Sequence, residues 1–299
     1  MITTDKENKK ILDEMFIIRQ WSQNTYRSYT SAVNIYSEVN NASLDKLVDE
    51  ADLEEEQQIK KNKRKIKQRF INFQKELLNK GYNKTTVKLY INRVKSIYHY
   101  FDIEIPNIPP IKTINTSTYE DLLTRDEFIT ILTNANSTMR AIITFGVSTG
   151  LRISDIANLT VNDFLEATKD YSEYKTGDSL YNHLIKLESE PIIVPTWKIT
   201  SIKTKVKHTT FNSDESSRYI IQYLKERVLS GNVCLTDKLF HVTAHTITVS
   251  LKRLNDRLNL GKTMNNYSKL HSHGLRKYMS TTLINDGLDF LRFFKLKKE

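Results

Sequence analysis

The chain contains 299 residues, of which 39% are hydrophobic and 27% charged, a mixture typical of a globular protein of about two domains. Its single cysteine excludes internal disulfides and cysteine-based zinc clusters, and its uncharged apolar runs fall far short of the roughly 20 residues that cross a bilayer. The 45 basic and 35 acidic residues give a net charge of +10, which is common among nucleic-acid proteins but not confined to them.

Neither secretion nor a membrane location is expected. The first ten residues carry charges of both signs, and no apolar block of a signal peptide follows them. With one cysteine, the chain suits a reducing compartment, so we expect a cytoplasmic protein. Only 8 glycines and 5 prolines are present, which disfavours turn-rich all-β folds and predicts a mainly helical chain.

Charge is divided unevenly along the first hundred residues. Residues 1–59 hold 6 Lys or Arg and 12 Asp or Glu, a net charge of −6, whereas residues 60–100 hold 13 Lys or Arg and one acid, a net charge of +12. The densest basic run comprises Lys60, Lys61, Lys63, Arg64, Lys65, Lys67 and Arg69. Such a surface gains binding free energy by releasing counterions from phosphates. A solvated helical face or loop is the alternative interpretation of the same run.

Three helices are expected in this region, over about 24–39, 66–78 and 85–101, because apolar residues recur there at helical spacing. Beside the apolar arc of the third helix lie four basic residues, Lys84, Lys88, Lys95 and His99. A basic ridge of this kind suits a phosphate backbone. The candidate nucleic-acid contacts are Lys84, Lys88, Lys95, Lys63, Arg64 and Lys65.

A proline-rich segment separates the first predicted domain, residues 1–105, from the second. Three prolines fall within five residues, and prolines force extended backbone and remove donors, so residues 106–118 are expected to form a linker. The pattern resumes near residue 119. It predicts helices near 125–134, 139–147 and 153–159, short strands at 192–194, 198–202 and 208–212, and a helix capped by Ser213 that ends near residue 229.

The first motif with chemical significance is Thr-Gly-Leu-Arg-Ile-Ser-Asp at residues 149–155. It places Arg152 just after a glycine turn at the start of a helix, where a guanidinium beside free backbone N–H groups favours a phosphate or a carboxylate. Arg152 could instead pair with Asp155 or Asp163.

Two further motifs follow in the sequence. The segment His-Gly-Leu-Arg ends at Arg276, and a helix starting near His273 would put His273 and Arg276 on one face. Lys203 lies between two candidate strands, so a tight hairpin would carry its ammonium group at the tip, where it could donate a proton to a leaving alkoxide. An exposed hairpin lysine without a catalytic role is the alternative.

In this order and at these separations, the three motifs resemble those of the tyrosine recombinases, the phage-integrase family of DNA strand-exchange enzymes. The resemblance implies that Arg152 and Arg276 clamp the scissile phosphate and that His273 hydrogen-bonds it and assists proton transfer. It also implies that Lys203 protonates the leaving 5′ oxygen and that Asp155 buttresses the first arginine. Fixed cations stabilise the charge of the transition state without a metal or other cofactor.

The resemblance extends to the architecture and the partners. It implies a mainly α fold with a small β-sheet, with a helical DNA core-binding domain at 1–105, the linker at 106–118 and a mixed α+β catalytic domain at 119–299. The implied function is site-specific recombination or integration of double-stranded DNA by a phage or mobile element. Members of the family act as tetramers on DNA, so a homo-oligomer is also implied.

The family's nucleophilic tyrosine has no match in this sequence. It is expected about 30 residues beyond the second arginine, whereas 23 residues follow Arg276 and no tyrosine follows Tyr278. Tyr278 is rotated about 200° from Arg276 on a helix, which favours core packing. We therefore expect a catalytic domain that is C-terminally incomplete, with an inactive DNA-binding remnant or regulator as the alternative. A metal-dependent nuclease using His271 and His273 is disfavoured, because no repeated acidic motif accompanies the two histidines.

Overall fold

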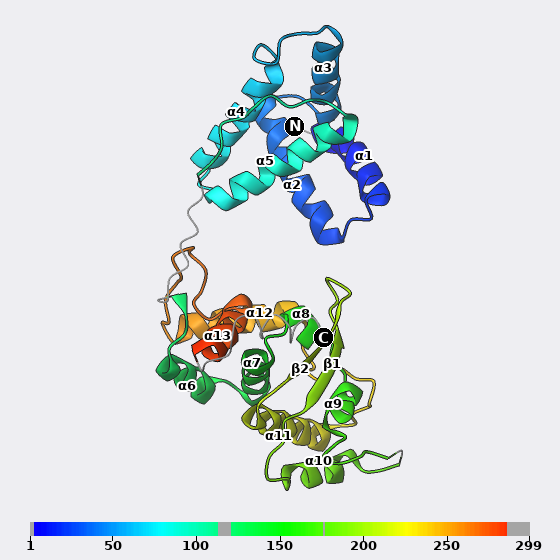
Figure 1. The fold of residues 1–299 in the computed structure, drawn as a ribbon, viewed down its shortest axis with the longest axis vertical. Helices are drawn as coiled ribbons and strands as arrows, with labels where there is room; N and C mark the ends of the chain where they lie inside the picture. Colours follow the sequence, from blue (N-terminus) through cyan, green and yellow to red (C-terminus); the bar gives the residue numbers. More distant parts are fainter. Residues whose placement is uncertain (1–2, 113–120, 176, 286–299) are drawn as a thin grey trace. The chain divides into compact units, whose positions relative to one another are not determined.

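The computed structural model describes residues 3–112, 121–175 and 177–285 of the chain. The chain divides into two compact units, Met1–Asn115 and Thr116–Glu299, which are drawn in Figure 1 and described separately below. Residues 113–118 of the expected linker and the C-terminal residues 286–299 lie outside the described residues.

The first unit is helical throughout its described elements. These are α1 (Thr3–Ile18), α2 (Gln23–Asn40), α3 (Leu44–Glu56), α4 (Lys65–Asn79), α5 (Lys84–Tyr98) and the short 3-10 helix η1 (His99–Phe101). Side-chain caps fix two of the starts: Ser22 accepts from the Thr25 N–H at the start of α2, and Asn83 accepts from the Thr86 N–H at the start of α5. The three helices expected from periodicity are confirmed, the last of them ending in η1. Helices α1 and α3 were not predicted.

Aromatic side chains form the centre of this unit's core. Tyr36, Phe70, Phe73 and Tyr98 are fully buried, and the rings of Tyr36 and Phe73 meet edge to face with centroids 5.1 Å apart. The hydroxyls of Tyr36 and Tyr98 lie 3.0 Å apart and satisfy each other inside the core. Because α2, α4 and α5 supply these rings, the core fixes the relative positions of the three helices.

The start of the proline-rich segment packs onto the helical unit. Ile103 is 2% exposed and Ile108 6% exposed, and both belong to the unit's apolar core. Pro106 between them is also buried. The segment therefore runs along the helices as far as Ile108, beyond the point at which the sequence predicts a linker to begin.

The second unit surrounds a central helix. Its described elements are α6 (Arg125–Asn134), α7 (Ser137–Thr149), α8 (Ile153–Ile156), α9 (Val161–Thr168), α10 (Leu180–Glu188), β1 (Thr196–Thr200), β2 (Lys207–Phe211), α11 (Asp214–Ser230), α12 (Ala244–Arg257) and α13 (Ser272–Asn285). Helix α7 packs against both α11 and α13, and its residues from Ala141 to Gly146 are all buried. Helix α7 therefore lies at the centre of this unit (Figure 1). The helix predicted to follow Ser213 is confirmed, since Ser213 accepts from the Ser216 N–H at the start of α11.

The two strands form an antiparallel hairpin. Thr196 pairs with Phe211 and Thr200 with Lys207, which confirms the two later predicted strands within about two residues. The strand predicted at 192–194 is wrong. Its backbone groups bond to side chains instead of to a neighbouring strand: the Ile193 N–H donates to Asp214 and the Val194 N–H donates to the Tyr171 hydroxyl.

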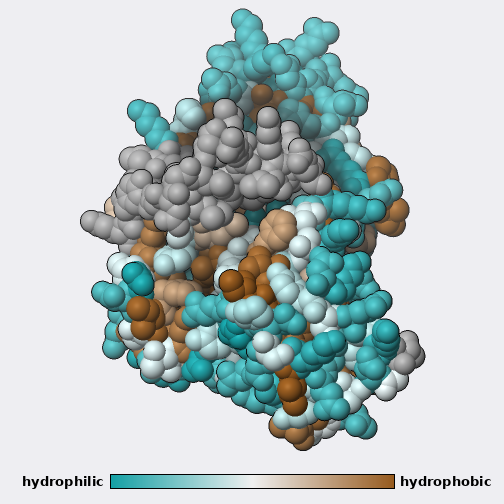
Figure 2. All heavy atoms as spheres, turned by 60° about the horizontal axis from the view of Figure 1, so that its bottom comes forward, coloured by the Kyte–Doolittle hydropathy of each residue, from teal (hydrophilic) through white to brown (hydrophobic). Residues whose placement is uncertain are grey.

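Together the described elements confirm a mainly α fold with a small β-sheet. Hydrophilic side chains cover most of the face shown in Figure 2, with apolar residues in separate patches. No helix in the described ranges combines the length and the apolar character needed to cross a membrane.

Candidate phosphate-binding site

A glycine turn at the end of α7 presents Arg152. Gly150 has a φ of 61°, a left-handed conformation, and its N–H donates to the Gly146 carbonyl over 3.0 Å. A Cβ on Gly150 would lie 3.1 Å from the Met279 sulfur of α13. The turn therefore needs glycine both for its backbone conformation and for the close approach of α13.

Arg152 is half-buried and linked to the β-hairpin. Its Nη1 donates to Ser201 Oγ over 3.2 Å, and Ser201 Oγ donates to Asp155 Oδ2 over 3.3 Å. The other oxygen of Asp155 accepts the Ile202 N–H over 3.0 Å. Asp155 is 3% exposed and thus forms a buried anchor beneath the guanidinium. Asp163, the alternative partner suggested by the sequence, instead completes a capping box at the start of α9.

Helix α13 brings the second arginine to the same place. Leu275 is 1% exposed and points toward α7, where its Cδ1 would lie 3.3 Å from a Cβ built on Gly146. His273 and Arg276 lie on another face of the helix, as their spacing predicts. Burial lowers the pKa of Arg276, the charge of Arg152 lowers it further, and Asp155 opposes this change. The two guanidinium groups are therefore close enough to repel each other, and a bound anion would relieve that repulsion.

His273 is the third member of this cluster. Its ring centroid lies 6.5 Å from that of His271, and it retains solvent exposure. Partial burial lowers its pKa below the ordinary value, and the charges of Lys277, His271 and Arg276 act in the same direction. At neutral pH the free imidazole is consequently neutral, and it can donate a hydrogen bond from one nitrogen while accepting at the other.

Lys203 lies in the exposed turn of the hairpin, outside this cluster. The turn is closed by the Ser201 N–H, which donates to the Val206 carbonyl over 2.9 Å, and by the Lys205 N–H, which donates to the Ser201 carbonyl over 2.8 Å. Lys205 has a φ of 56°. The structure thus joins Arg152, Asp155, His273 and Arg276 in one region and connects Lys203 to them through the base of the hairpin.

The sequence motifs did not identify two residues of this network. Ser201 stands between Arg152 and Asp155, and Thr210 of β2 donates from Oγ1 to the Thr149 carbonyl over 3.0 Å. Both are small hydroxyl residues in or near strands. Nothing in their local sequence distinguishes them from solvent-facing strand residues, so only the tertiary contacts assign them to the site.

Tyr278 packs away from this cluster. Its ring stacks on that of Phe128 at a centroid distance of 5.3 Å and an interplanar angle of 17°. Both residues join the apolar core of the second unit. The prediction of core packing for Tyr278 is confirmed.

The basic candidates in the first unit differ in their surroundings. Lys84 and Lys88 are exposed on α5, whereas Lys95 is half-buried, and Lys63 is exposed before α4. Arg64 is 8% exposed, donates from Nε to the Ile59 carbonyl over 3.0 Å and forms an ion pair with Glu55.

Lys65 belongs to a cluster of cations around α3. Its ammonium lies 2.8 Å from Glu50, which also pairs with Arg69. Lys61 pairs with Glu104. Four cations of the basic run, Lys61, Arg64, Lys65 and Arg69, therefore form ion pairs within the unit, whereas Lys84 and Lys88 of α5 are exposed and take no part in these pairs.

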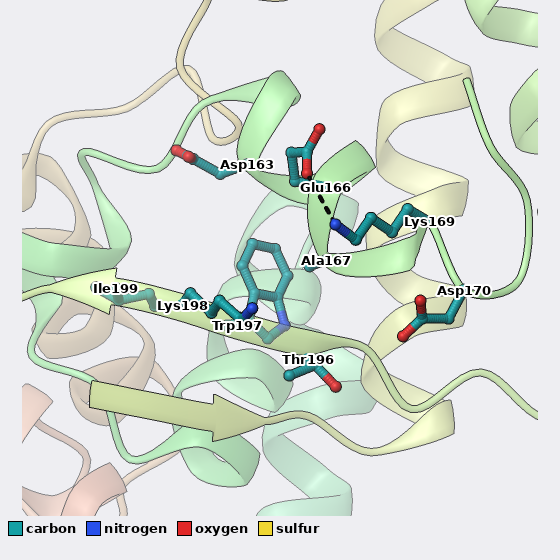
Figure 3. Close-up of a pocket in the computed structure, with 9 residues that line it drawn as sticks. All are labelled: Asp163, Glu166, Ala167, Lys169, Asp170, Thr196, Trp197, Lys198 and Ile199. Carbon is teal, nitrogen blue, oxygen red and sulfur yellow. Dashed lines mark ion pairs between the residues drawn. The ribbon is translucent and has the colours of Figure 1, made fainter. Parts of the chain in front are cut away.

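A pocket of about 440 Å³ lies between α9 and β1 (Figure 3). Its lining combines acidic and basic side chains with one wall formed by the buried Trp197: Asp163, Glu166, Ala167, Lys169, Asp170, Thr196, Trp197, Lys198 and Ile199. Glu166 and Lys169 form an ion pair across 3.6 Å. Three carboxylates make this pocket a poor phosphate site.

In the described part of the chain, no group of three His, Cys, Asp or Glu residues is placed to hold a metal.

The mainly helical fold and the paired arginines agree with the family that the three motifs resemble. Comparison with protein families gives a match to the phage integrase family over residues 121–293, and the chain belongs to that family. The match contains Arg152, Asp155, Lys203, His273 and Arg276. No curated protein matches the chain.

Solved structures share the fold at low sequence identity. The chain is similar to lambda integrase bound to DNA, with 12% identity, 97% of this chain and 91% of that chain covered, and a TM-score of 0.63. It is similar to the Tn1549 transposon integrase in complex with transposon right end DNA, with 14% identity, 96% and 88% coverage and a TM-score of 0.62. A lambda integrase tetramer bound to a Holliday junction gives 13% identity, 100% and 77% coverage and a TM-score of 0.61.

Proposed function

We propose that this protein binds double-stranded DNA and acts in site-specific recombination by transesterification, with one backbone phosphate held between Arg152 and Arg276. The convergence of these two guanidinium groups is the observation that carries the proposal. They come from the end of the glycine turn and from α13, which meet where Met279 lies against Gly150. Burial lowers the pKa of Arg276, and the charge of Arg152 lowers it further. Such an arrangement is favourable when an anion is bound between the two groups.

The proposed roles follow from where charge develops during the reaction. As an attacking hydroxyl bonds to the phosphorus and the 5′ oxygen leaves, negative charge grows on the non-bridging oxygens, and Arg152 and Arg276 would stabilise it. His273, neutral when free, would hydrogen-bond an oxygen of the same phosphate and assist proton transfer. Lys203, on the hairpin turn, would give a proton to the departing 5′ oxygen. Asp155 would hold Arg152 and the hairpin in register.

A regulator or remnant that binds DNA without cutting it is the second candidate. One observation favours it: Tyr278, which follows Arg276 by two residues, is stacked on Phe128 in the core. Transesterification requires a nucleophile that attacks phosphorus and forms a covalent bond as the 5′ oxygen leaves. Without such a group, the four residues around the phosphate would bind and polarise it only.

The first unit would supply further DNA contacts. We propose that the first unit, including the segment that packs on it as far as Ile108, forms a core-binding domain, that the residues after Ile108 link it to a catalytic domain at 119–299, and that Lys84, Lys88 and Lys95 contact phosphates. Lys63 and Lys65 are secondary candidates. Arg64 is left out of this surface because it is buried against Glu55.

The family relationship also suggests the setting of the reaction. We propose integration or excision of a phage or mobile element in the cytoplasm, with several copies of the chain assembled on DNA. A tetramer of lambda integrase has been solved on a Holliday junction. Sedimentation of the protein with and without its DNA site measures this assembly, and a single copy on each duplex at saturation would contradict it.

Nicked duplexes test the two candidate functions. DNA selected for binding to the full chain is prepared with a nick near the presumed cleavage position, so that a covalent product is trapped. A recombinase yields a denaturation-resistant protein–DNA adduct, whereas a regulator binds without one. The Arg152→Ala/Arg276→Ala double variant is the control and should yield no adduct and weaker binding. Wild-type binding no tighter than that of this control would contradict both candidates.

A further inference from the structure

Ser201 lies at the junction of three parts of the proposed site. Its side chain is buried, with the residue 1% exposed, and its Oγ lies 3.2 Å from Arg152 Nη1 and 3.3 Å from Asp155 Oδ2. Its backbone closes the hairpin turn that carries Lys203, since its N–H and carbonyl both make hydrogen bonds across the turn. One residue therefore contacts the arginine, its acidic support and the lysine-bearing hairpin.

The direction of the hydrogen bonds is fixed by the chemistry of the partners. A guanidinium only donates and a carboxylate only accepts, so the Ser201 hydroxyl must accept from Arg152 and give its own proton to Asp155. The three groups form a one-way chain from Arg152 through Ser201 to Asp155. Because both ends are charged and the centre is buried, each bond is stronger than one between neutral groups in water.

Asp155 completes the link to the hairpin. While one carboxylate oxygen accepts from Ser201 Oγ, the other accepts from the Ile202 N–H over 3.0 Å. The carboxylate thereby holds two consecutive residues just before Lys203. A shift of the Arg152 side chain would alter the Ser201 bond and, through Asp155, the backbone that positions the lysine.

We propose that Ser201 is a positioning residue that couples the Arg152 guanidinium to the Lys203 hairpin, so that phosphate binding and placement of the proton donor occur together. This inference rests on the proposed function, because it gives the coupling a role in DNA strand exchange. Ser201 touches no reacting atom in this scheme. It acts through Arg152 and through the hairpin.

A set of four variants distinguishes the effect of the Ser201 hydroxyl from the effect of side-chain volume. Ser201→Ala removes the hydroxyl; Ser201→Thr and Ser201→Val add the same bulk, but only Thr retains the hydroxyl. Thr200→Val is the matched control, because Thr200 is an exposed strand residue next to Ser201. With selected duplex DNA, Ser201→Ala and Ser201→Val should weaken binding about three- to tenfold, the scale of the net contribution of one ordinary hydrogen bond. Ser201→Thr and Thr200→Val should remain close to the wild type.

A double-mutant cycle shows whether Ser201 acts through Arg152. If it does, Ser201→Ala should cause little further loss of affinity in an Arg152→Ala background. Additive losses, or equal losses for the Thr and Val variants, would reduce Ser201 to a packing role and overturn the proposal. The loss of DNA affinity in the Ser201 variants would then be attributed to the altered volume of the side chain.

Hydrogen exchange tests the same coupling without DNA. In the full-length free protein, Arg152→Ala should accelerate exchange of the Ile202 amide, and this acceleration should vanish when Ser201 is already Ala. If Arg152→Ala leaves the exchange rate of the Ile202 amide unchanged while Ser201 is intact, the proposed coupling is wrong. If the protein fails to bind DNA, the proposed function is wrong, and the exchange experiment still decides the link between Arg152, Ser201 and the hairpin.

Discussion

Thr210 Oγ1 donates a hydrogen bond to the Thr149 carbonyl over 3.0 Å, which fastens the second hairpin strand to the last residue of α7. Arg152 follows that residue by three positions. The turn that presents the first arginine is therefore attached to the hairpin at two places, once through Thr210 and once through Ser201. This double attachment joins the turn to the hairpin, while Met279 of α13 lies against Gly150 of the same turn.

Removing either arginine of the proposed clamp should weaken DNA binding and lower its salt dependence. We expect Arg152→Ala and Arg276→Ala each to reduce the slope of log affinity against log salt by about one unit, since each removes one phosphate contact. Anisotropy titrations at several salt concentrations measure the slope. Circular dichroism checks the fold, and an unchanged slope in a folded variant would show that the arginine does not contact phosphate.

DNA affinity should rise as the pH falls through the range in which His273 takes up a proton. The pKa of this histidine in the free protein lies below 6.5, and a bound phosphate would raise it by favouring the imidazolium. The complex then binds more protons than the free protein between the two pKa values, so acidification favours binding there. His273→Gln should flatten this part of the affinity profile, and an identical profile in the variant would contradict the prediction.

The same depressed pKa has the opposite effect on folding. The unfolded chain has an ordinary histidine pKa, so it binds protons more readily than the free folded protein. Below about pH 6.5, His273 should therefore reduce the free energy of unfolding as the pH falls. Urea unfolding at several pH values measures this effect, with His273→Gln as the reference. Stability that rises on acidification through His273 would contradict the sign.

Gly150→Ala should destabilise the second unit, because it introduces a Cβ at a left-handed position that also lies against Met279. The backbone term alone amounts to about 1–2 kcal/mol. Gly231→Ala is the matched control: Gly231 has a φ of 169°, an extended conformation open to any residue, and its Cβ would meet nothing within 4 Å. Urea unfolding of both variants gives the comparison, and equal stabilities would remove the special role of Gly150.

Neutralising the accessible lysines of α5 should weaken DNA binding more than neutralising paired lysines elsewhere in the same unit. We compare Lys84→Gln/Lys88→Gln with Lys61→Gln/Lys65→Gln, because the second pair already faces Glu104 and Glu50. The salt slope should fall by about one unit for each lysine that touches a phosphate in the wild type. A salt slope of Lys84→Gln/Lys88→Gln that equals the wild-type slope would show that the α5 ridge is only solvated.

Periodicity predicted α2, α4 and α5 of the first unit and α6 and α7 of the second, because a buried stripe repeats with the period of the helix itself. It missed α1 and α3, although Met15 and Leu47 are buried in the core. The segment around Ile193 shows where this reasoning fails. Its β-branched residues favour an extended chain, but its N–H groups bond to Asp214 and Tyr171 rather than to a strand. Whether extended backbone joins a sheet depends on partners distant in sequence.

The site was only partly predictable for a related reason. Arg152, His273 and Arg276 belong to dense motifs that mark a turn or a helix start, and so their positions could be foreseen. Ser201 belongs to an ordinary strand end, and its role depends on a contact 49 residues away. Arg64 shows the converse, since its sequence neighbours suggest a DNA surface, but its burial and its ion pair with Glu55 remove it from that surface.

Glu50 of the acidic helix α3 acts as an internal counterion for part of the basic run. Glu50 holds Lys65 and Arg69, so a DNA phosphate that engaged either cation would compete with that carboxylate. Part of the free energy gained from such a phosphate contact would be spent on displacing Glu50. The basic run therefore contributes less to DNA affinity than its number of cations suggests.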